Sequence, residues 1–160
     1  MLREKLDYAG VVDVSIIVIS SFENPARIDA LKFLKDVLSW KIKAIIPVTA
    51  FIGAYHILTR YLKLPKKEIK DVIRDTLSIP SPAIFEDISV KAAIEAIEYA
   101  VAYNIESWDG YIVYLAKEYA SGIIYSIDKD FEKVEGVNLV IPISEKRLNE
   151  YHKFIENILK

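Results

Sequence analysis

The sequence contains no cysteine and no glutamine, and it has only two histidines, His56 and His152. Without cysteine, the chain cannot form disulfides, use a thiolate as a nucleophile, or hold zinc or an iron–sulfur cluster through sulfur. Two histidines are also too few for a histidine-rich metal site. Thiol chemistry and metal centres based on sulfur or on many histidines are therefore excluded.

Long apolar runs and a secretory signal are also missing. The longest apolar stretch, residues 11–19, is interrupted by Asp13 and falls far short of the roughly 20 residues that cross a bilayer. The first ten residues include four charged ones, where a secretory signal would be apolar. We therefore expect a cytoplasmic protein without a membrane span.

The 160 residues include no low-complexity tract, no Pro/Gly/Ser-rich linker and no internal repeat. A hydrophobic content of 52% suffices for one good core, but this length leaves no room for two ordinary domains. We therefore expect a single domain over residues 1–160. The formal net charge of −2 lacks the basic excess that is usual in nucleic-acid-binding domains, so any polyanion must be held locally.

Hydrophobic patterns typical of strands alternate with patterns typical of helices along the chain. Residues 10–19 are almost continuously apolar and β-branched, which indicates a central strand covered on both faces. Further strands are predicted at 43–48, 83–85, 122–128 and 139–143, and helices at 27–40, 49–62, between Pro65 and Pro80, 91–103, 109–119 and 144–159. This alternation predicts an α/β fold with a mostly parallel central sheet and helices on both faces.

Apolar side chains at helical spacing mark the helix faces that we expect to be buried. The last helix has Ser144 as its predicted N-cap. The side chains expected to point inward are Ile28, Leu31, Leu34, Val37 and Leu38 in the helix at 27–40, Ile94, Ile97 and Val101 in the helix at 91–103, and Leu148, Tyr151, Ile155 and Leu159 in the last helix.

Three acidic segments stand near the carboxyl ends of predicted strands, where ligands bind in such folds. Asp13 lies among apolar neighbours, Asp128 and Asp130 follow an apolar strand, and Asp109 opens a predicted helix, whose positive dipole end favours a carboxylate. Each has a structural alternative, as a cap, a helix-start residue or a turn former. If the segments converge, their mutual repulsion requires a hard divalent cation such as Mg²⁺ or Mn²⁺, which can activate water for attack on a phosphodiester.

Taken in order, these segments resemble the PIN-domain family, which includes the VapC toxins of toxin–antitoxin pairs and several RNA-processing nucleases. Asp13 and Ser15 are similar to the family's opening Asp-x-Ser/Thr motif, after which the chain of family members turns into a helix. Ser107-Trp-Asp109 is similar to the third motif, and Ser126-Ile-Asp128-Lys-Asp130-Phe131 to the closing one. The resemblance covers about residues 10–143 and implies a three-layer sandwich.

The resemblance also implies the site residues and the cofactor. By this likeness the catalytic metal ligands are Asp13, Asp109 and Asp128, with Asp130 as a further ligand, Ser15 and Ser126 as auxiliary residues, and Mg²⁺ or Mn²⁺ as the metal. One acid of the family pattern is missing, because Gly53 stands where the second motif has a glutamate. Glycine weakens a helix by about 1 kcal/mol relative to alanine, so it is not there for stability.

Glu106, three residues before Asp109, is an auxiliary candidate that could compensate for the missing acid, although a solvent-facing loop glutamate is the simpler interpretation. The residues that would bind RNA stay unknown. Lys66, Lys70 and Arg74 recur at four-residue spacing, but interleaved acids favour a salt-bridged, solvated helix face. Trp108, beside Asp109, is the aromatic residue that we would watch for base stacking.

Two functions fit these observations. The first is a metal-dependent endoribonuclease of the VapC type, for which the resemblance implies an RNA substrate, a homodimer and a small antitoxin as partner. The second is a degenerate PIN domain that binds RNA or a protein without cutting. Gly53 favours the second function, whereas retention of the other acids favours the first.

Overall fold

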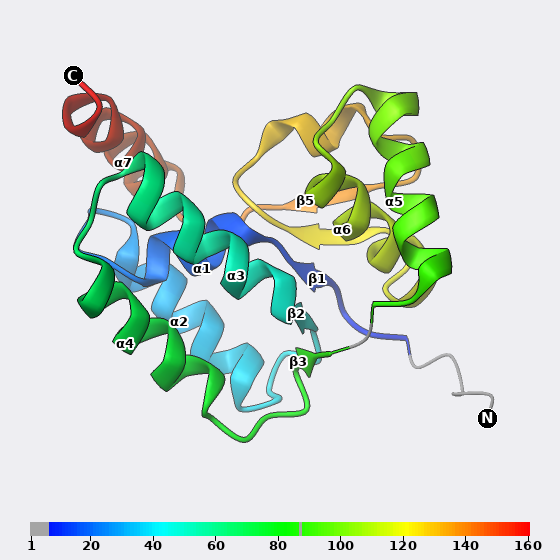
Figure 1. Cartoon of the computed structure of the whole chain (residues 1–160), viewed down its shortest axis with the longest axis horizontal. Helices are drawn as coiled ribbons and strands as arrows, with labels where there is room; N and C mark the ends of the chain where they lie inside the picture. Colours follow the sequence, from blue (N-terminus) through cyan, green and yellow to red (C-terminus); the bar gives the residue numbers. More distant parts are fainter. Residues whose placement is uncertain (1–6, 87) are drawn as a thin grey trace.

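The computed structural model describes residues 7–86 and 88–160. At its centre lie short parallel strands, and Figure 1 shows how the helices surround them. The strands are β1 (Val11–Val12), β2 (Ile46–Pro47), β3 (Ile84–Phe85), β4 (Ile123–Tyr125) and β5 (Asn138–Val140). An isolated parallel bridge from Val11 to Ile45 joins the β1-β4-β5 sheet to the β2-β3 sheet, so the spatial order is β3-β2-β1-β4-β5.

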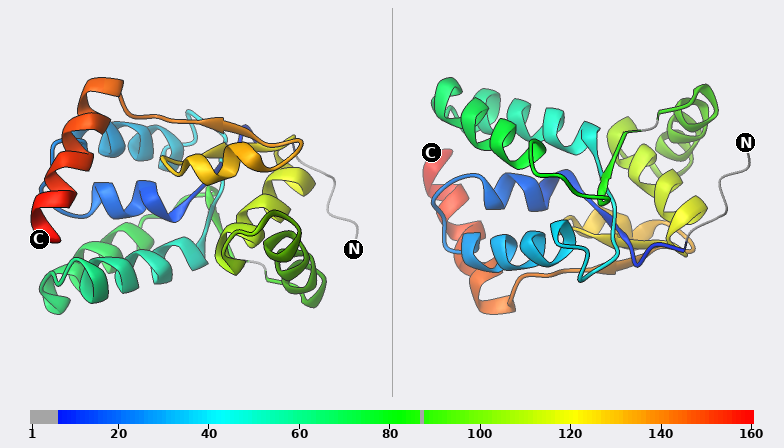
Figure 2. Two further views of the ribbon diagram at one scale, coloured as in Figure 1. Left: turned by 90° about the horizontal axis from the view of Figure 1, so that it is seen from above. Right: turned by 90° about the horizontal axis from the view of Figure 1, so that it is seen from below.

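Helices cover the strands on two sides and give three layers (Figures 1 and 2). Successive strand residues face opposite layers, since Val11 packs into one apolar cluster and Val12 into the other. On the side of Val12 lie α1 (Val14–Ser20), α2 (Arg27–Leu38), α3 (Val48–His56) with its π-helical continuation η1 (Ile57–Tyr61), α4 (Lys66–Leu77) and α7 (Glu145–Ile158). On the side of Val11 lie α5 (Val90–Tyr103), α6 (Ser107–Tyr119) and the short 3₁₀ helix η2 (Lys129–Lys133). The predicted α/β fold with a parallel sheet is confirmed.

The predicted strand over residues 10–19 is wrong beyond Val12. Asp13 takes an extended conformation as the N-cap of α1, and its side chain accepts a hydrogen bond from the Ser15 backbone N–H. Residues 16–20 are all buried, because α1 packs between α2 and α3. A helix that is apolar all round has no amphipathic period, so its sequence resembles that of a buried strand. The helix start that the family resemblance implied near Ser15 is confirmed.

The predicted inward face of α5 is also wrong. Ala92 and Ala96 are buried, whereas Ile94, Ile97 and Val101 are 53%, 58% and 79% exposed. Small residues face inward because α5 and α6 approach closely: a Cβ on Gly110 would lie 2.1 Å from the Ala96 carbonyl oxygen. Bulky residues cannot occupy that face, so they lie on the outside. In α2, Ile28 and Leu31 are likewise exposed; the buried side chains of this helix are Ala30, Phe33, Leu34 and Val37.

The connectivity of the strands identifies the edge at which a ligand is expected. From β1 the chain moves outward to β2 and β3, and then returns to the other side of β1 to form β4 and β5. The order therefore reverses between β1 and β4, and in open parallel sheets ligands bind beyond the carboxyl ends of the strands at this switch point. Within residues 7–86 and 88–160, none of the helices combines the length and the apolar character needed to span a membrane.

Candidate active site

A groove of about 670 Å³ opens beyond the carboxyl ends of β1 and β4. The site residues predicted from the sequence come together there, although they lie on segments far apart in the chain. Asp13 and Ser15 reach it from the start of α1, Asp109 from the first turn of α6, and Asp128 and Asp130 from the segment after β4. Glu106, just before α6, lies in the same wall. The carboxylates thus share one surface at the switch point of the sheet.

Asp13 is the most deeply buried of these acids, with only 2% of its surface exposed. Burial raises the pKa of its carboxyl above the ordinary value, and hydrogen bonds from Ser126 and Ser15 oppose part of that rise. The proposed structural alternative for Asp13 is realised, since its side chain caps α1. In the capping contact, Oδ2 accepts from the Ser15 N–H at 3.3 Å. A role as cap therefore does not preclude a role as metal ligand.

Two serines connect the ends of β1 and β4. The Ser126 hydroxyl donates to Asp13 Oδ2 at 2.7 Å and accepts from the Asp128 backbone N–H at 2.9 Å. Because the Ser126 proton is committed to Asp13, the Ser15 hydroxyl must donate in the 3.1 Å contact between the two hydroxyl groups. Ser15 also accepts from the Ile127 N–H at 3.2 Å. Both auxiliary serines therefore hold the strand ends, and with them Asp13 and Asp128, in fixed relative positions.

Asp128 and Asp109 are placed by two helix starts. Asp128 caps η2, and its Oδ1 accepts from the Asp130 N–H at 2.9 Å, so the turn-forming role considered from the sequence is present as well. Asp109 lies one residue before Gly110, where the close approach of α5 fixes the position of α6. Desolvation is the largest cause that raises the pKa of Asp109, and together with the charges of Asp13, Asp128, Glu106 and Asp130, in that order, it brings this pKa to about 7. The acids are near enough to repel one another.

The donor set in this wall suits a hard divalent cation. Its charged groups are carboxylates, and carboxylate oxygens are the ligands that Mg²⁺ and Mn²⁺ prefer. Within the described residues, however, no three acidic or histidine side chains stand close enough together to hold an ion as they are. A cation would therefore have to draw these side chains together, and relief of their repulsion would favour that movement.

Gly53 lies beside this wall without lining it. A Cβ at Gly53 would meet Cγ2 of Val14, a groove residue, at 3.2 Å, which is closer than an ordinary van der Waals contact. The position therefore faces the start of α1, next to Asp13. A larger residue there requires Val14 to shift by a few tenths of an ångström.

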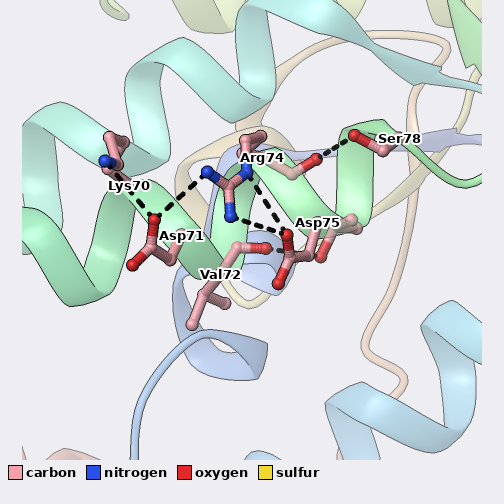
Figure 3. Close-up of polar contacts among 7 residues, drawn as sticks. Lys70, Asp71, Val72, Arg74, Asp75 and Ser78 are labelled. Carbon is pink, nitrogen blue, oxygen red and sulfur yellow. Dashed lines mark hydrogen bonds and ion pairs between the residues drawn. The ribbon is translucent and has the colours of Figure 1, made fainter.

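The basic residues singled out in the sequence do not line the groove. On α4, Arg74 pairs with Asp71 and Asp75, and Lys70 pairs with Asp71 (Figure 3). The sequence-based interpretation of a salt-bridged, solvated face is therefore confirmed for this helix. Lys133 of η2, which was not among these candidates and is also outside the described lining, donates to the Asn104 carbonyl oxygen at 3.1 Å. Trp108 is 62% exposed but lies outside the described lining of the groove.

Sequence reasoning missed three polar residues of the groove: Asn104, Tyr151 and His152. Asn104 takes a left-handed conformation after α5, with φ of 51°. Tyr151 was expected only as a core residue of the last helix. No signal in the sequence links α7 to the acidic segments, because their proximity arises only from tertiary packing.

The raised pKa of Asp109 predicts how stability depends on pH without metal. Between pH 3.8 and about 7 the folded chain binds a proton at Asp109 that the unfolded chain has released, so the free energy of unfolding falls as pH rises through this window. The Asp109→Asn variant should not show this fall in the free energy of unfolding. In EDTA at pH 8 we expect the variant to exceed the wild type by ~1–2 kcal/mol after solvent screening, with little difference at pH 4, in urea unfolding. Glu135→Gln, which changes an exposed carboxyl outside the groove, is the control. Equal pH slopes for Asp109→Asn and the wild type would show that the pKa of Asp109 is not raised in the folded chain.

Comparison with known proteins independently supports the resemblance to the PIN-domain family that the sequence motifs indicate. The chain is similar in fold to a protein described as "Crystal structure of PAE2754 from Pyrobaculum aerophilum", with a TM-score of 0.57, 13% identity, and coverage of 96% of this chain and 90% of that chain. No curated protein matches the sequence. The PIN-domain family model matches residues 10–137, which end just before β5, somewhat short of the expected residue 143. The chain therefore belongs to the PIN-domain family, whose members are in general divalent-metal-dependent nucleases.

Proposed function

We propose that this protein is a metal-dependent endoribonuclease that hydrolyses RNA phosphodiester bonds. The observation that carries the proposal is the gathering of Asp13, Asp109 and Asp128 in one groove at the switch point of a PIN-domain sheet. Their mutual repulsion, which adds to desolvation in raising the pKa of Asp109, would be relieved by a bound cation.

In this proposal Asp13, Asp109 and Asp128 hold Mg²⁺ or Mn²⁺, and Asp130 assists from the turn after β4. When bound, such an ion activates water and neutralises charge that develops on the phosphodiester. Ser126 and Ser15 position the ligands, since their hydroxyl groups connect Asp13 to the Asp128 backbone. Glu106 adds negative charge beside Asp109, which strengthens attraction for the cation.

The rival proposal is a degenerate PIN domain that binds RNA or a protein without cutting, and Gly53 is the observation that favours it. The Gly53→Glu variant distinguishes the two proposals, because it places a carboxylate beside Val14 at the edge of the site. We expect tighter Mn²⁺ binding in calorimetry and faster cleavage of unstructured RNA, because the site regains a negative charge. Steric adjustment of Val14 will offset part of the roughly 1 kcal/mol gained in helix propensity.

Gly53→Gln is the matched control, since glutamine has similar bulk and helix propensity but no charge. It should match Gly53→Glu in stability and the wild type in activity. The enzyme proposal requires cleavage by the wild type that a chelator and Asp109→Asn both abolish. If only Gly53→Glu cuts, the domain is degenerate and the rival holds; if neither protein cuts at high metal concentration, the placement of Gly53 or the nuclease proposal is wrong.

Within the family, we place the chain with the VapC toxins, acting in the cytoplasm against RNA and restrained by a small antitoxin. The support for this assignment is the resemblance of the chain's motifs to the PIN-domain family, of which the VapC toxins are one branch. A neighbouring reading frame that encodes a small DNA-binding protein would identify the antitoxin that this assignment requires.

The expected homodimer has support from the exposed face of α5. Val90, Ile94, Ile97 and Val101 are all more than half exposed and follow one another at intervals of four, three and four residues, the spacing of a helix-packing seam. An isolated soluble chain rarely exposes such a stripe, so we propose that a second copy covers it. Light scattering after size exclusion should give a dimer for the wild type and a monomer for Ile97→Glu. Lys91→Glu, a charge reversal outside the stripe on the same helix, should stay dimeric; a monomeric wild type would contradict the proposal.

A further inference from the structure

The groove presents an electrostatic problem for an RNA-binding protein. Five acidic side chains line it, and none of the lysines or arginines among the described residues does so. A metal ion at the carboxylate wall can compensate for the phosphate that lies against it, but RNA is a chain of phosphates. Any neighbouring phosphate in the groove therefore needs a donor of its own.

α7 supplies a histidine at that place. His152 lines the groove and is exposed to solvent. It is the one described lining side chain that can carry a positive charge. Val18 of α1 lines the groove as well, and it lies five residues beyond Asp13 along the chain, roughly 7.5 Å at 1.5 Å per helical residue. The groove thus continues along α1 away from the carboxylates, and α7 contributes to its lining.

The position of His152 is fixed by contacts that do not involve the acidic wall. Asp29 of α2 accepts a hydrogen bond from the Ser144 N–H at 2.9 Å and forms an ion pair with Arg147, which fastens the first turn of α7 to α2. Tyr151, only 7% exposed, packs in the core, and its ring lies 6.0 Å from the His152 ring. α7 is held at the end of the molecule opposite the described N-terminal residues (Figure 2). These contacts present His152 to the groove before any ligand binds.

We infer that His152 binds a backbone phosphate of single-stranded RNA next to the phosphate that is cut. This inference rests on the proposed ribonuclease function and adds to it a substrate-binding residue. His152 lies in α7, beyond residues 10–137 that match the PIN-domain family model. The imidazole N–H groups donate to phosphate oxygens, and they supply the donor that the acidic wall lacks.

The test is fluorescence anisotropy with a short, labelled, single-stranded RNA, with Ca²⁺ in place of Mg²⁺ to slow cutting. His152→Ala should raise the Kd about tenfold, the effect of one hydrogen bond to a charged group, and His152→Gln, which keeps an N–H donor, should restore part of the affinity. His56→Ala is the matched control: this second exposed histidine lies outside the described lining, and its removal should leave the Kd unchanged. Because His152 is exposed, the variants should melt at the wild-type temperature.

Each outcome decides the inference. An unchanged Kd for His152→Ala overturns it, as does equal weakening by His56→Ala, which would indicate only general electrostatics. A wild type that does not bind RNA overturns it too. A wild type that binds RNA tightly and never cuts it contradicts the proposed nuclease activity alone, and the binding role of His152 is then decided by the variants.

Discussion

The repulsion among the carboxylates of Asp13, Asp109 and Asp128 is the main constraint at the candidate site, and the fold keeps these side chains near one another despite it. The strand order brings Asp13 and Asp128 to one edge, and the start of α6 adds Asp109, so that burial and like charge raise the pKa of Asp109 to about 7. Without a cation this arrangement is unfavourable, since charged groups are separated from water and held near one another. The close contact of Gly110 with Ala96 and the hydrogen bonds of Ser15 and Ser126 fix the segments that carry these acids.

The structural roles of the acids are compatible with the chemical roles proposed for them. Asp13 caps α1 and Asp128 caps η2, each through one carboxylate oxygen, as N-cap residues generally do. The capping contacts orient the two carboxylates, which both line the groove. Ser126 connects the two caps through its single hydroxyl group. Helix capping and turn formation, which allowed a purely structural interpretation of these acids, therefore also orient them in the groove.

The α/β class, the parallel sheet and the segments that carry the acids were predictable, because alternating apolar patterns and strand-end positions are local properties of the sequence. The length of β1 was not, because α1 is buried on all sides and its sequence lacks an amphipathic period. The inward face of α5 was missed because a close approach to α6, and not hydrophobicity, selects Ala92 and Ala96. His152 joins the groove only through tertiary packing of α7, which no local pattern encodes.

The central claim is that Asp13, Asp109 and Asp128 form one cation site although they stand apart without the ion. A crystal structure of the wild type soaked in Mn²⁺, with anomalous scattering to locate the metal, tests this claim most directly. We predict an anomalous peak in direct contact with oxygens of all three carboxylates, the side chains drawn together around it, and no peak in crystals of Asp109→Asn. An ion bound elsewhere, or three carboxylates that stay apart at saturating Mn²⁺, would contradict the claim.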